Sequence, residues 1–300
     1  MNRRNTPRIS FIGFGEAGQA IASGLRDAGV ERIAAWDILF PEQAGAHLKA
    51  AGEAIGVHAA ASAADAVREA DLVISAVTAA SSVDAARSVA PHLNNNPYYL
   101  DINSVSPGRK QETAKLLGKR ARYVDVAVVA AIHPARHRTP LLIAGPHAEK
   151  VSPLLRELEM QLSVVGSETG SAAAIKMIRS VMIKGIEALT LECFLAAARA
   201  GVLDEVTTSL KNNYPTLDWN KVIEYNIERM ASHGVRRADE MDQVAETLRE
   251  LGIDPLMATA TSTRQREMGL LGKEPAVRKT LKEGRSAMLD AISTAAKDRH

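Results

Sequence analysis

Short apolar runs alternate with amphipathic stretches along the first half of the chain. Residues 8–13 are mainly β-branched and aromatic, and a helical pattern follows them to about Ala28. Ser62 is a residue type favoured at helix N-caps, which predicts a helix over residues 62–70. The same alternation predicts further strands over residues 32–37, 71–77, 98–102, 123–129 and 141–144.

The run over residues 71–77 is almost continuously apolar, which is typical of a parallel strand covered on both faces. Strands that alternate with helices in this way favour a parallel sheet with helices on both sides. We therefore expect an α/β fold whose first half is a doubly wound parallel sheet.

The pattern changes near residue 166, after which we expect only helices. Apolar residues lie nearly all round residues 168–200, as in a helix buried in a domain centre or between subunits. Glycines at 201, 234 and 252 are expected near helix ends. Further helices are predicted over residues 202–213, 218–232, 236–251, 255–270 and 276–297. The chain is thus expected to form two domains, residues 1–165 and 166–300, joined by the long helix.

A glycine-rich turn, GFGEAG, lies between the first predicted strand and the first predicted helix. Gly13 permits a tight turn, Gly15 lets a pyrophosphate approach the helix N-terminus, and Gly18 lets the helix pack on the strand. The alternative is a glycine turn that binds nothing. The strand before it and the helix after it favour a dinucleotide-binding Rossmann domain. The expected cofactor contacts in this turn are Gly13, Phe14, Gly15, Glu16, Ala17 and Gly18.

Asp37 ends the second predicted strand, 19 residues after Gly18. A carboxylate there can accept hydrogen bonds from both hydroxyls of the adenosine ribose, and it would repel a 2′-phosphate. NAD is therefore favoured over NADP. The alternative is an ordinary cap at the strand end. Val77 and Thr78 end a later strand, at the position that passes beneath the adenosine and the nicotinamide ribose in such folds. For these two residues a plain strand-to-helix turn is the alternative.

Composition narrows the class of protein further. Lys and Arg total 37 against 35 Asp and Glu, so no basic field favours nucleic acid, and no apolar run approaches the ~18 residues of a membrane span. The single cysteine, Cys193, excludes an internal disulfide and is expected in the core. No His, Asp or Glu spacing indicates a metal site. Residues 1–7 are polar, so we expect no signal peptide and a cytoplasmic protein.

These residues resemble the β-hydroxyacid dehydrogenase family, which includes 3-hydroxyisobutyrate dehydrogenase and is related to 6-phosphogluconate dehydrogenase. The resemblance covers most of residues 8–200. It rests on the glycine turn, on DINSVSP at 101–107 and on GSAAAIK at 170–176. The later motifs KMIRS (176–180) and HGVRRADEM (233–241) are more similar to a phosphogluconate dehydrogenase-like group with a C-terminal domain of unknown function.

The resemblance implies hydride transfer between a 3-hydroxy acid and a nicotinamide cofactor. Lys176 matches the lysine that serves as general base, a role that needs an amine able to lose its proton near neutral pH. The alternative is a surface lysine. Ser180 stands where the family usually has an asparagine that orients the substrate hydroxyl. Substrate is expected in an interdomain cleft between residues 103–104 and 176–180.

Four further positions are expected near the substrate. Asn103 and Ser104 match a Ser-Thr pair that binds substrate in the family, and Asn103 is also expected to contact the cofactor. The alternative is that the pair caps the helix that begins at Pro107. Val129 and Ala130 stand where the family has a Ser-Gly-Gly turn, which changes the expected pocket.

Basic residues extend the expected site in two places. His133 belongs to a basic loop over residues 132–138, which indicates a substrate with extra negative charge; a solvated loop is the alternative. Arg236 is expected at the start of a helix, where it would bind a carboxylate or a phosphate, or would pair with Asp239 and Glu240.

The sequence therefore predicts an NAD(P)-dependent dehydrogenase with a small hydroxy acid substrate. The helical domain is expected to bind substrate and to form a homodimer through the long helix. Two alternatives stay open: an imine or enamine reductase with the same fold, and a dinucleotide-binding protein without catalytic activity.

Overall fold

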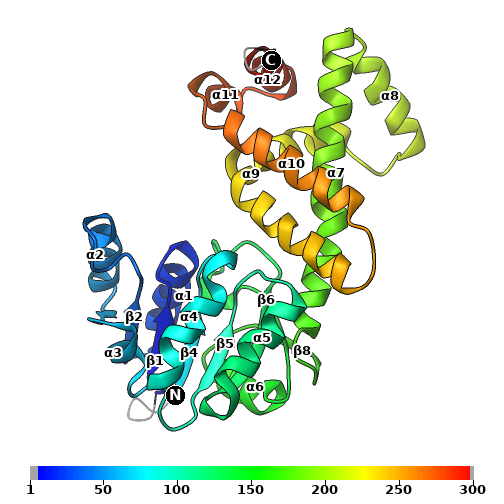
Figure 1. Cartoon of the computed structure of the whole chain (residues 1–300). Coiled ribbons are helices and arrows are strands. Elements are labelled where there is room, and N and C mark those ends of the chain that lie inside the picture. The colour runs from blue at the N-terminus through cyan, green and yellow to red at the C-terminus, as the bar shows by residue number, and fades with distance from the viewer. Residues whose placement is uncertain (1–5, 298–300) are drawn as a thin grey trace. The chain divides into compact units, whose positions relative to one another are not determined.

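The computed structural model describes residues 6–297. Residues 1–5, which carry most of the polar segment behind the signal-peptide expectation, lie outside the described residues, as do 298–300. The chain divides into two compact units, Met1–Met177 and Ile178–His300. The two units are coloured from blue to green and from green to red in Figure 1.

The first unit is built on an eight-stranded sheet in the order β3-β2-β1-β4-β5-β6-β7-β8, counted over residues 6–297. β1 pairs in parallel with β2 on one side and with β4 on the other. The strands are β1 Ile9–Ile12, β2 Ile33–Trp36, β3 His58–Ala59, β4 Leu72–Ser75, β5 Tyr98–Asp101, β6 Arg122–Val128, β7 Leu141–Ala144 and β8 Leu162–Gly166.

Helices cover both faces of this sheet (Figure 1). Successive β4 side chains alternate between the two cores, since Leu72 and Ile74 belong to one cluster and Val73 to the other. Ser62 accepts a hydrogen bond from Asp65 N at 3.1 Å, which confirms the predicted N-cap. The helices are α1 Glu16–Asp27, α2 Ala46–Ala54, α3 Ala63–Val67, α4 Ser82–Val89, α5 Pro107–Leu117 and α6 Ala148–Glu157. The doubly wound fold predicted from the sequence is confirmed.

The sheet differs from the prediction in the direction of one strand, β7, and in the presence of two further strands, β3 and β8. β7 runs antiparallel to β6, because the residues between them form only a short 3-10 turn, Arg136–Arg138, instead of a crossover helix. β3 and β8 were not predicted. β3 has only two residues, and β8 is nowhere fully buried, so neither carries a strong apolar run.

The second unit is helical throughout its described residues. The long helix α7, Ser171–Ala200, begins in the first unit and continues into the second. The others are α8 Leu203–Asn213, α9 Trp219–Glu250, α10 Leu256–Leu271, α11 Pro275–Thr280 and α12 Arg285–Lys297.

Two glycines explain where the predicted helices differ from these. The expected helices 218–232 and 236–251 form one continuous helix, α9, so placing a helix end at Gly234 was wrong. A Cβ on Gly234 would lie 2.2 Å from Gln265 O, so this glycine lets α9 and α10 pack closely. The expected helix 276–297 is instead divided into α11 and α12, with Gly284 at φ +91° between them.

The long helix α7 buries polar as well as apolar side chains and exposes several large apolar ones. Polar side chains are buried, including Lys184 (5% exposed) and Glu187 (2%), whereas Met182 (65%) and Leu189 (57%) are exposed. Of the two expected settings for α7, burial in a domain centre is wrong for this helix, and burial between subunits stays a prediction. Cys193 also lies on an exposed part of this helix, not in the core as expected. No helix within residues 6–297 combines the length and apolarity needed to cross a bilayer.

Candidate active site

The glycine turn has the close contacts that only glycine allows. Gly13 has φ +89°, and a Cβ on it would lie 2.3 Å from Ala76 O at the end of β4. A Cβ on Gly18 would lie 2.6 Å from Gly13 O, so this glycine lets α1 approach the turn. Phe14 is fully buried in the core between them. The turn is thereby held against the carboxyl ends of β1 and β4.

The N-terminus of α1 is open to an anionic group. Gly15 is its N-cap, and no side chain within residues 6–297 caps the helix there. A Cβ on Gly15 would meet nothing within 4 Å, so there is space beside the first-turn N–H groups. Glu16 is exposed and Ala17 half-buried on this first turn. This geometry fits the pyrophosphate of a dinucleotide.

Asp37 is fixed beside the same turn. Its Oδ2 accepts a hydrogen bond from Phe14 N at 2.7 Å, and its Oδ1 accepts one from Leu39 N at 3.0 Å. The carboxylate therefore caps the end of the strand, which was the alternative interpretation of Asp37. Its role in binding a ribose stays a prediction.

Asn103 joins the ends of β4 and β5. Its Oδ1 accepts a hydrogen bond from Val77 N at 2.7 Å, and its Nδ2 donates one to Ser75 Oγ at 3.0 Å. The side chain is buried, at 4% exposure. Thr78, next in the β4 turn, donates to Ser81 Oγ at 3.1 Å. Asn103 thus holds the segment expected to pass beneath the cofactor.

Ser104 meets Lys176. Lys176 Nζ donates a hydrogen bond to Ser104 Oγ at 2.6 Å, and the contact is partly buried. The alternative helix-cap role belongs instead to Ser106, whose Oγ accepts from Arg109 N at 3.4 Å at the start of α5. The turn after β5 and the start of α7 therefore bring together two residues that the sequence assigned to one site.

Asp125 was missed as a functional position by reasoning from the sequence. Its Oδ2 accepts hydrogen bonds from Gly170 N, Ala172 N and Ala173 N at 3.0, 2.9 and 3.2 Å. A carboxylate in the middle of β6 thus holds the N-terminus of the helix that carries Lys176. The signal was present in the sequence as one acidic residue within the otherwise apolar strand 123–129.

Ser180 lies one turn after Lys176 on α7 and is 7% exposed. Its Oγ accepts from Lys184 Nζ at 3.4 Å. Lys184 also forms an ion pair with Glu240 at 2.9 Å. In the second unit, Ser180 is therefore part of a polar stripe that runs along α7.

The loop after β6 is arranged differently from its expected role. Ala130 and His133 are exposed, and Val129 is half-buried, with its N–H bonded to Pro140 O at 3.2 Å. Both arginines of the loop have acidic partners: Arg136 pairs with Asp27 at 2.7 Å, and Arg138 pairs with Glu159. This pairing weakens the hypothesis that the loop reads extra negative charge on a substrate.

His137 anchors this loop to α1. It is 3% exposed and lies where a Cβ on Gly24 would meet its ring. Burial lowers the pKa of His137, and Arg138 adds to the effect. At least one basic residue of this loop, His137, therefore has a structural role, which is to pack the loop against α1.

Arg236 lies within α9 rather than at a helix start, so that part of the prediction was wrong. It is exposed and forms an ion pair with Glu240 at 3.1 Å. The neighbouring Arg237 pairs with Glu187 in the interior of the helical unit. The charged residues at 236 and 237 thus have partners in their own unit, as the alternative interpretation of Arg236 proposed.

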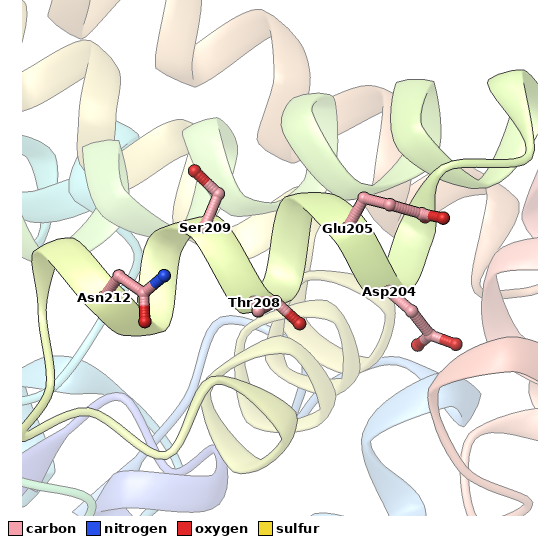
Figure 2. A pocket seen from close by; sticks show the side chains of 5 residues that line it. All are labelled: Asp204, Glu205, Thr208, Ser209 and Asn212. Carbon is pink, nitrogen blue, oxygen red and sulfur yellow. The ribbon is translucent and has the colours of Figure 1, made fainter.

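Figure 2 shows a pocket in the helical unit that is lined by none of the candidate site residues. Its lining side chains all belong to α8, and Asp204 among them pairs with Arg285 at 2.7 Å. The lining residues are Asp204, Glu205, Thr208, Ser209 and Asn212.

Comparisons with known proteins match the two units separately. A family model described as the NAD binding domain of 6-phosphogluconate dehydrogenase matches residues 8–166. A model described as a domain of unknown function (DUF1932) matches residues 197–268. The first match includes the glycine turn and every strand of the sheet, and the second lies within the helical unit.

Two of the matching solved structures are described first because each is at least 30% identical to this chain. A conserved hypothetical protein from Sinorhizobium meliloti 1021 is 35% identical over 98% of both chains, with a TM-score of 0.78. A conserved protein of unknown function, described as structurally similar to 3-hydroxyacid dehydrogenases, is 30% identical. That match covers 89% of this chain and 100% of the other, with a TM-score of 0.69.

Enzymes of known activity share the fold at lower identity, and two of them serve as examples. Mycobacterium tuberculosis 3-hydroxyisobutyrate dehydrogenase, solved with L-serine, is 16% identical over 97% of this chain and 99% of its own, with a TM-score of 0.70. An imine reductase variant from Myxococcus stipitatus, in complex with NAD+, is 21% identical over 96% and 99%, with a TM-score of 0.55. At these identities the likeness concerns the fold alone.

Proposed function

The chain belongs to the family of 6-phosphogluconate dehydrogenase NAD-binding domains, and we propose that it is an oxidoreductase that interconverts a 3-hydroxy acid and its carbonyl form. The observation that carries the proposal is the hydrogen bond between Lys176 Nζ and Ser104 Oγ. It brings an amine to the hydroxyl that follows β5, at the carboxyl end of a parallel strand. Open α/β sheets bind their ligands at such ends.

The glycine turn would hold the cofactor. Backbone N–H groups at Gly15 and the first turn of α1 suit its pyrophosphate, and Asp37 suits a ribose with both hydroxyls unmodified. We therefore propose NAD in preference to NADP. The bound nicotinamide supplies the hydride acceptor in oxidation and the hydride donor in reduction. Val77 and Thr78, held by Asn103, would support the cofactor from below.

Lys176 would act as the general base. In oxidation it takes the proton of the substrate hydroxyl on Nζ while the carbinol carbon becomes a carbonyl, and in reduction it returns that proton. Ser104 orients the amine and supplies a polar atom for the substrate. Ser180, one turn further along α7, would orient the substrate oxygen in place of the asparagine usual in the resembling family.

The remaining predicted contacts divide into two groups. Val129 and Ala130 follow β6 and would shape the pocket with apolar atoms, whereas Asn103 acts on the β4 turn rather than on the substrate. We leave His133 and Arg236 outside the proposed site, because His133 is exposed and Arg236 pairs with Glu240.

An imine or enamine reductase is the second candidate. The observation that favours it is the apolar segment at Val129–Ala131, which replaces the polar turn of the hydroxyacid dehydrogenases that the sequence resembles. A pocket with fewer hydrogen-bond donors is less suited to a carboxylate and more tolerant of a cyclic imine. A dinucleotide-binding protein without catalytic activity is a weaker alternative, since it leaves the Lys176–Ser104 pair without a purpose.

We also propose that the protein is a homodimer of the cytoplasm. An exposed apolar stripe on α7 supports dimerisation, because Ile178, Met182 and Leu189 lie along one side of this long helix. A second copy of the same helix would cover such a stripe. The single cysteine is compatible with a reducing compartment.

Absorbance at 340 nm tests the proposed reaction. Purified protein is mixed with NAD or NADP and a panel of branched, aromatic and phosphorylated 3-hydroxy acids, and separately with NADH or NADPH and cyclic imines. We expect turnover of at least one hydroxy acid, faster with NAD. Turnover of imines alone would replace the dehydrogenase by the reductase, and cofactor binding without any turnover would support the silent protein.

A further inference from the structure

A buried lysine lies beneath the proposed site and is not used by the mechanism above. Lys110, on α5, is 1% exposed and contacts the end of β5 and the middle of β6. Its Nζ donates to Asp101 O at 2.6 Å and to Val126 O at 3.3 Å. It also forms ion pairs with Asp101 Oδ1 at 3.1 Å and Asp125 Oδ1 at 3.7 Å. One ammonium thus binds two adjacent strands through both their backbones and their carboxylates.

Asp101 leads from Lys110 to Ser104. Its Oδ1 also accepts a hydrogen bond from Asn103 N at 3.0 Å, and its Oδ2 accepts one from Tyr123 Oη at 2.8 Å. The carboxylate is completely buried. It therefore fixes the first turn of the segment that presents Ser104.

Asp125 leads from Lys110 to Lys176. Its Oδ2 holds the three N–H groups at the start of α7, at positions 170, 172 and 173, one turn before Lys176. Its Oδ1 accepts no hydrogen bond among the described residues and faces Lys110 instead. Burial raises the pKa of Asp125, and Lys110 and the α7 N–H groups oppose that effect. The ammonium is thus the charge that makes an ionised Asp125 tolerable in the interior.

We propose that Lys110 is a positioning residue that holds Ser104 and Lys176 against each other through Asp101 and Asp125 and balances the buried charge beneath them. On one side, Lys110 pairs with Asp101, which accepts from the N–H of Asn103, the residue before Ser104. On the other side, Lys110 pairs with Asp125, which accepts from the first N–H groups of α7, the helix that carries Lys176. The hydrogen bond between Lys176 and Ser104 joins the two sides. The inference rests on the proposed function, since positioning matters only if Lys176 transfers a proton.

This set of contacts has a measurable electrostatic consequence. Two carboxylates and one ammonium leave one net negative charge near the start of α7. Replacement of Lys110 by methionine removes the positive charge, so the pKa of Lys176 should rise, on the order of one unit. Replacement of Asp125 by asparagine removes a negative charge, so that pKa should fall. The charged or titratable groups facing Lys110 are Asp101, Asp125 and, through Asp101, Tyr123, and Arg179 is the nearest charged residue along α7 after Lys176.

Competitive acetylation tests this consequence without a substrate. The full-length protein is labelled with acetic anhydride across a pH series, and mass spectrometry gives the midpoint of labelling for Lys176. Lys110→Met should shift the midpoint upward by about one pH unit. Lys115→Met, which removes a charge from an exposed position of the same helix, is the matched control and should leave it unchanged. A folded Lys110→Met variant with the midpoint of the control overturns the proposal.

A second comparison applies if Lys110→Met does not fold. Asp125→Asn should lower the midpoint, and the Lys110→Met/Asp125→Asn double variant, with one buried negative charge as in the wild type, should restore it. A double variant with the same midpoint as Asp125→Asn overturns the role of Lys110.

Turnover adds the positioning readout. Lys110→Met should lower kcat at least tenfold and shift its pH profile to higher pH, with the affinity for NAD unchanged. A folded variant with wild-type kcat and pH profile contradicts the proposal. If the variants shift the labelling midpoint of Lys176 but the wild-type protein turns over no substrate, only the proposed reaction is overturned. The failure of the proposed function and the failure of the role of Lys110 can therefore be told apart.

Discussion

Lys176 Nζ lies 2.6 Å from Ser104 Oγ, although the two residues are 72 positions apart in the sequence. Ser104 follows strand β5, and Lys176 lies in the first turns of α7. Their meeting is the geometric basis of the proposed acid–base chemistry, because it places the amine beside the carboxyl end of β5, and open α/β sheets bind their ligands at such ends.

Ser104→Ala should lower kcat/KM by about tenfold to a hundredfold, because the variant loses one orienting hydrogen bond to Lys176. Steady-state kinetics with the best hydroxy acid of the panel measures the effect. Ser106→Ala is the matched control: it removes the α5 cap and should cost about 1 kcal/mol of stability while sparing kcat/KM. Equal losses of kcat/KM in the two variants would show that Ser104 is merely structural.

Asp37→Ser should weaken NAD binding about tenfold and narrow the preference for NAD over NADP, because the carboxylate that binds ribose and repels phosphate is gone. Quenching of intrinsic tryptophan fluorescence by each cofactor gives the two Kd values. Glu42→Ser, which removes an exposed carboxylate shortly after β2, is the control. An unchanged ratio of Kd values in Asp37→Ser would exclude Asp37 as the selector.

Met182→Glu should convert the dimer to a monomer, because it places a charge at the centre of the exposed apolar stripe of α7. Sedimentation velocity measures the oligomeric state at a fixed protein concentration. Leu256→Glu, at an apolar position that is 70% exposed on α10, is the control for a new surface charge. A wild-type protein that sediments as a monomer would contradict the proposed dimer directly.

His137 should make the fold less stable in mild acid. Burial, with help from Arg138, lowers its pKa in the folded state, so below about pH 6.5 the unfolded chain binds a proton that the folded chain resists. The stabilisation is complete above that pH and is lost as the pH falls toward the lower folded-state pKa. Thermal melting from pH 8 to 5 should show a smaller acid loss in His137→Asn than in the wild type. His133→Asn, at an exposed position of the same loop, should melt like the wild type at every pH.

The pattern of residues along the chain predicted those parts of the fold that depend on residues close together in the sequence. The apolar run at 71–77 predicted β4, and the glycine turn predicted the approach of α1 to β1. Gly234 shows the limit of such reasoning, since the same residue can end a helix or permit a close helix contact. Only the position of Gln265 on α10 decides between the two.

The sequence predicted the residues proposed to carry out the chemistry, but not the buried residues that hold them in place. Motifs indicated Lys176 and Ser104, but Lys110 and Asp125 meet them only through contacts between separate elements. Periodicity also could not predict which face of α7 is buried, because apolar residues occur on all sides of the helix and its buried side includes polar residues such as Lys184 and Glu187. Buried ion pairs of this kind depend on tertiary structure, which a single-sequence pattern does not carry.

The most direct test is the turnover of Lys176→Ala on the substrate identified with the wild-type enzyme. If Lys176 is the general acid and base, kcat should fall by about a thousandfold at neutral pH, while the affinity for NAD stays within about twofold of wild type. Lys176→Arg, which keeps the charge but cannot give up its proton, should be equally inactive. Full turnover in Lys176→Ala would contradict the proposed mechanism.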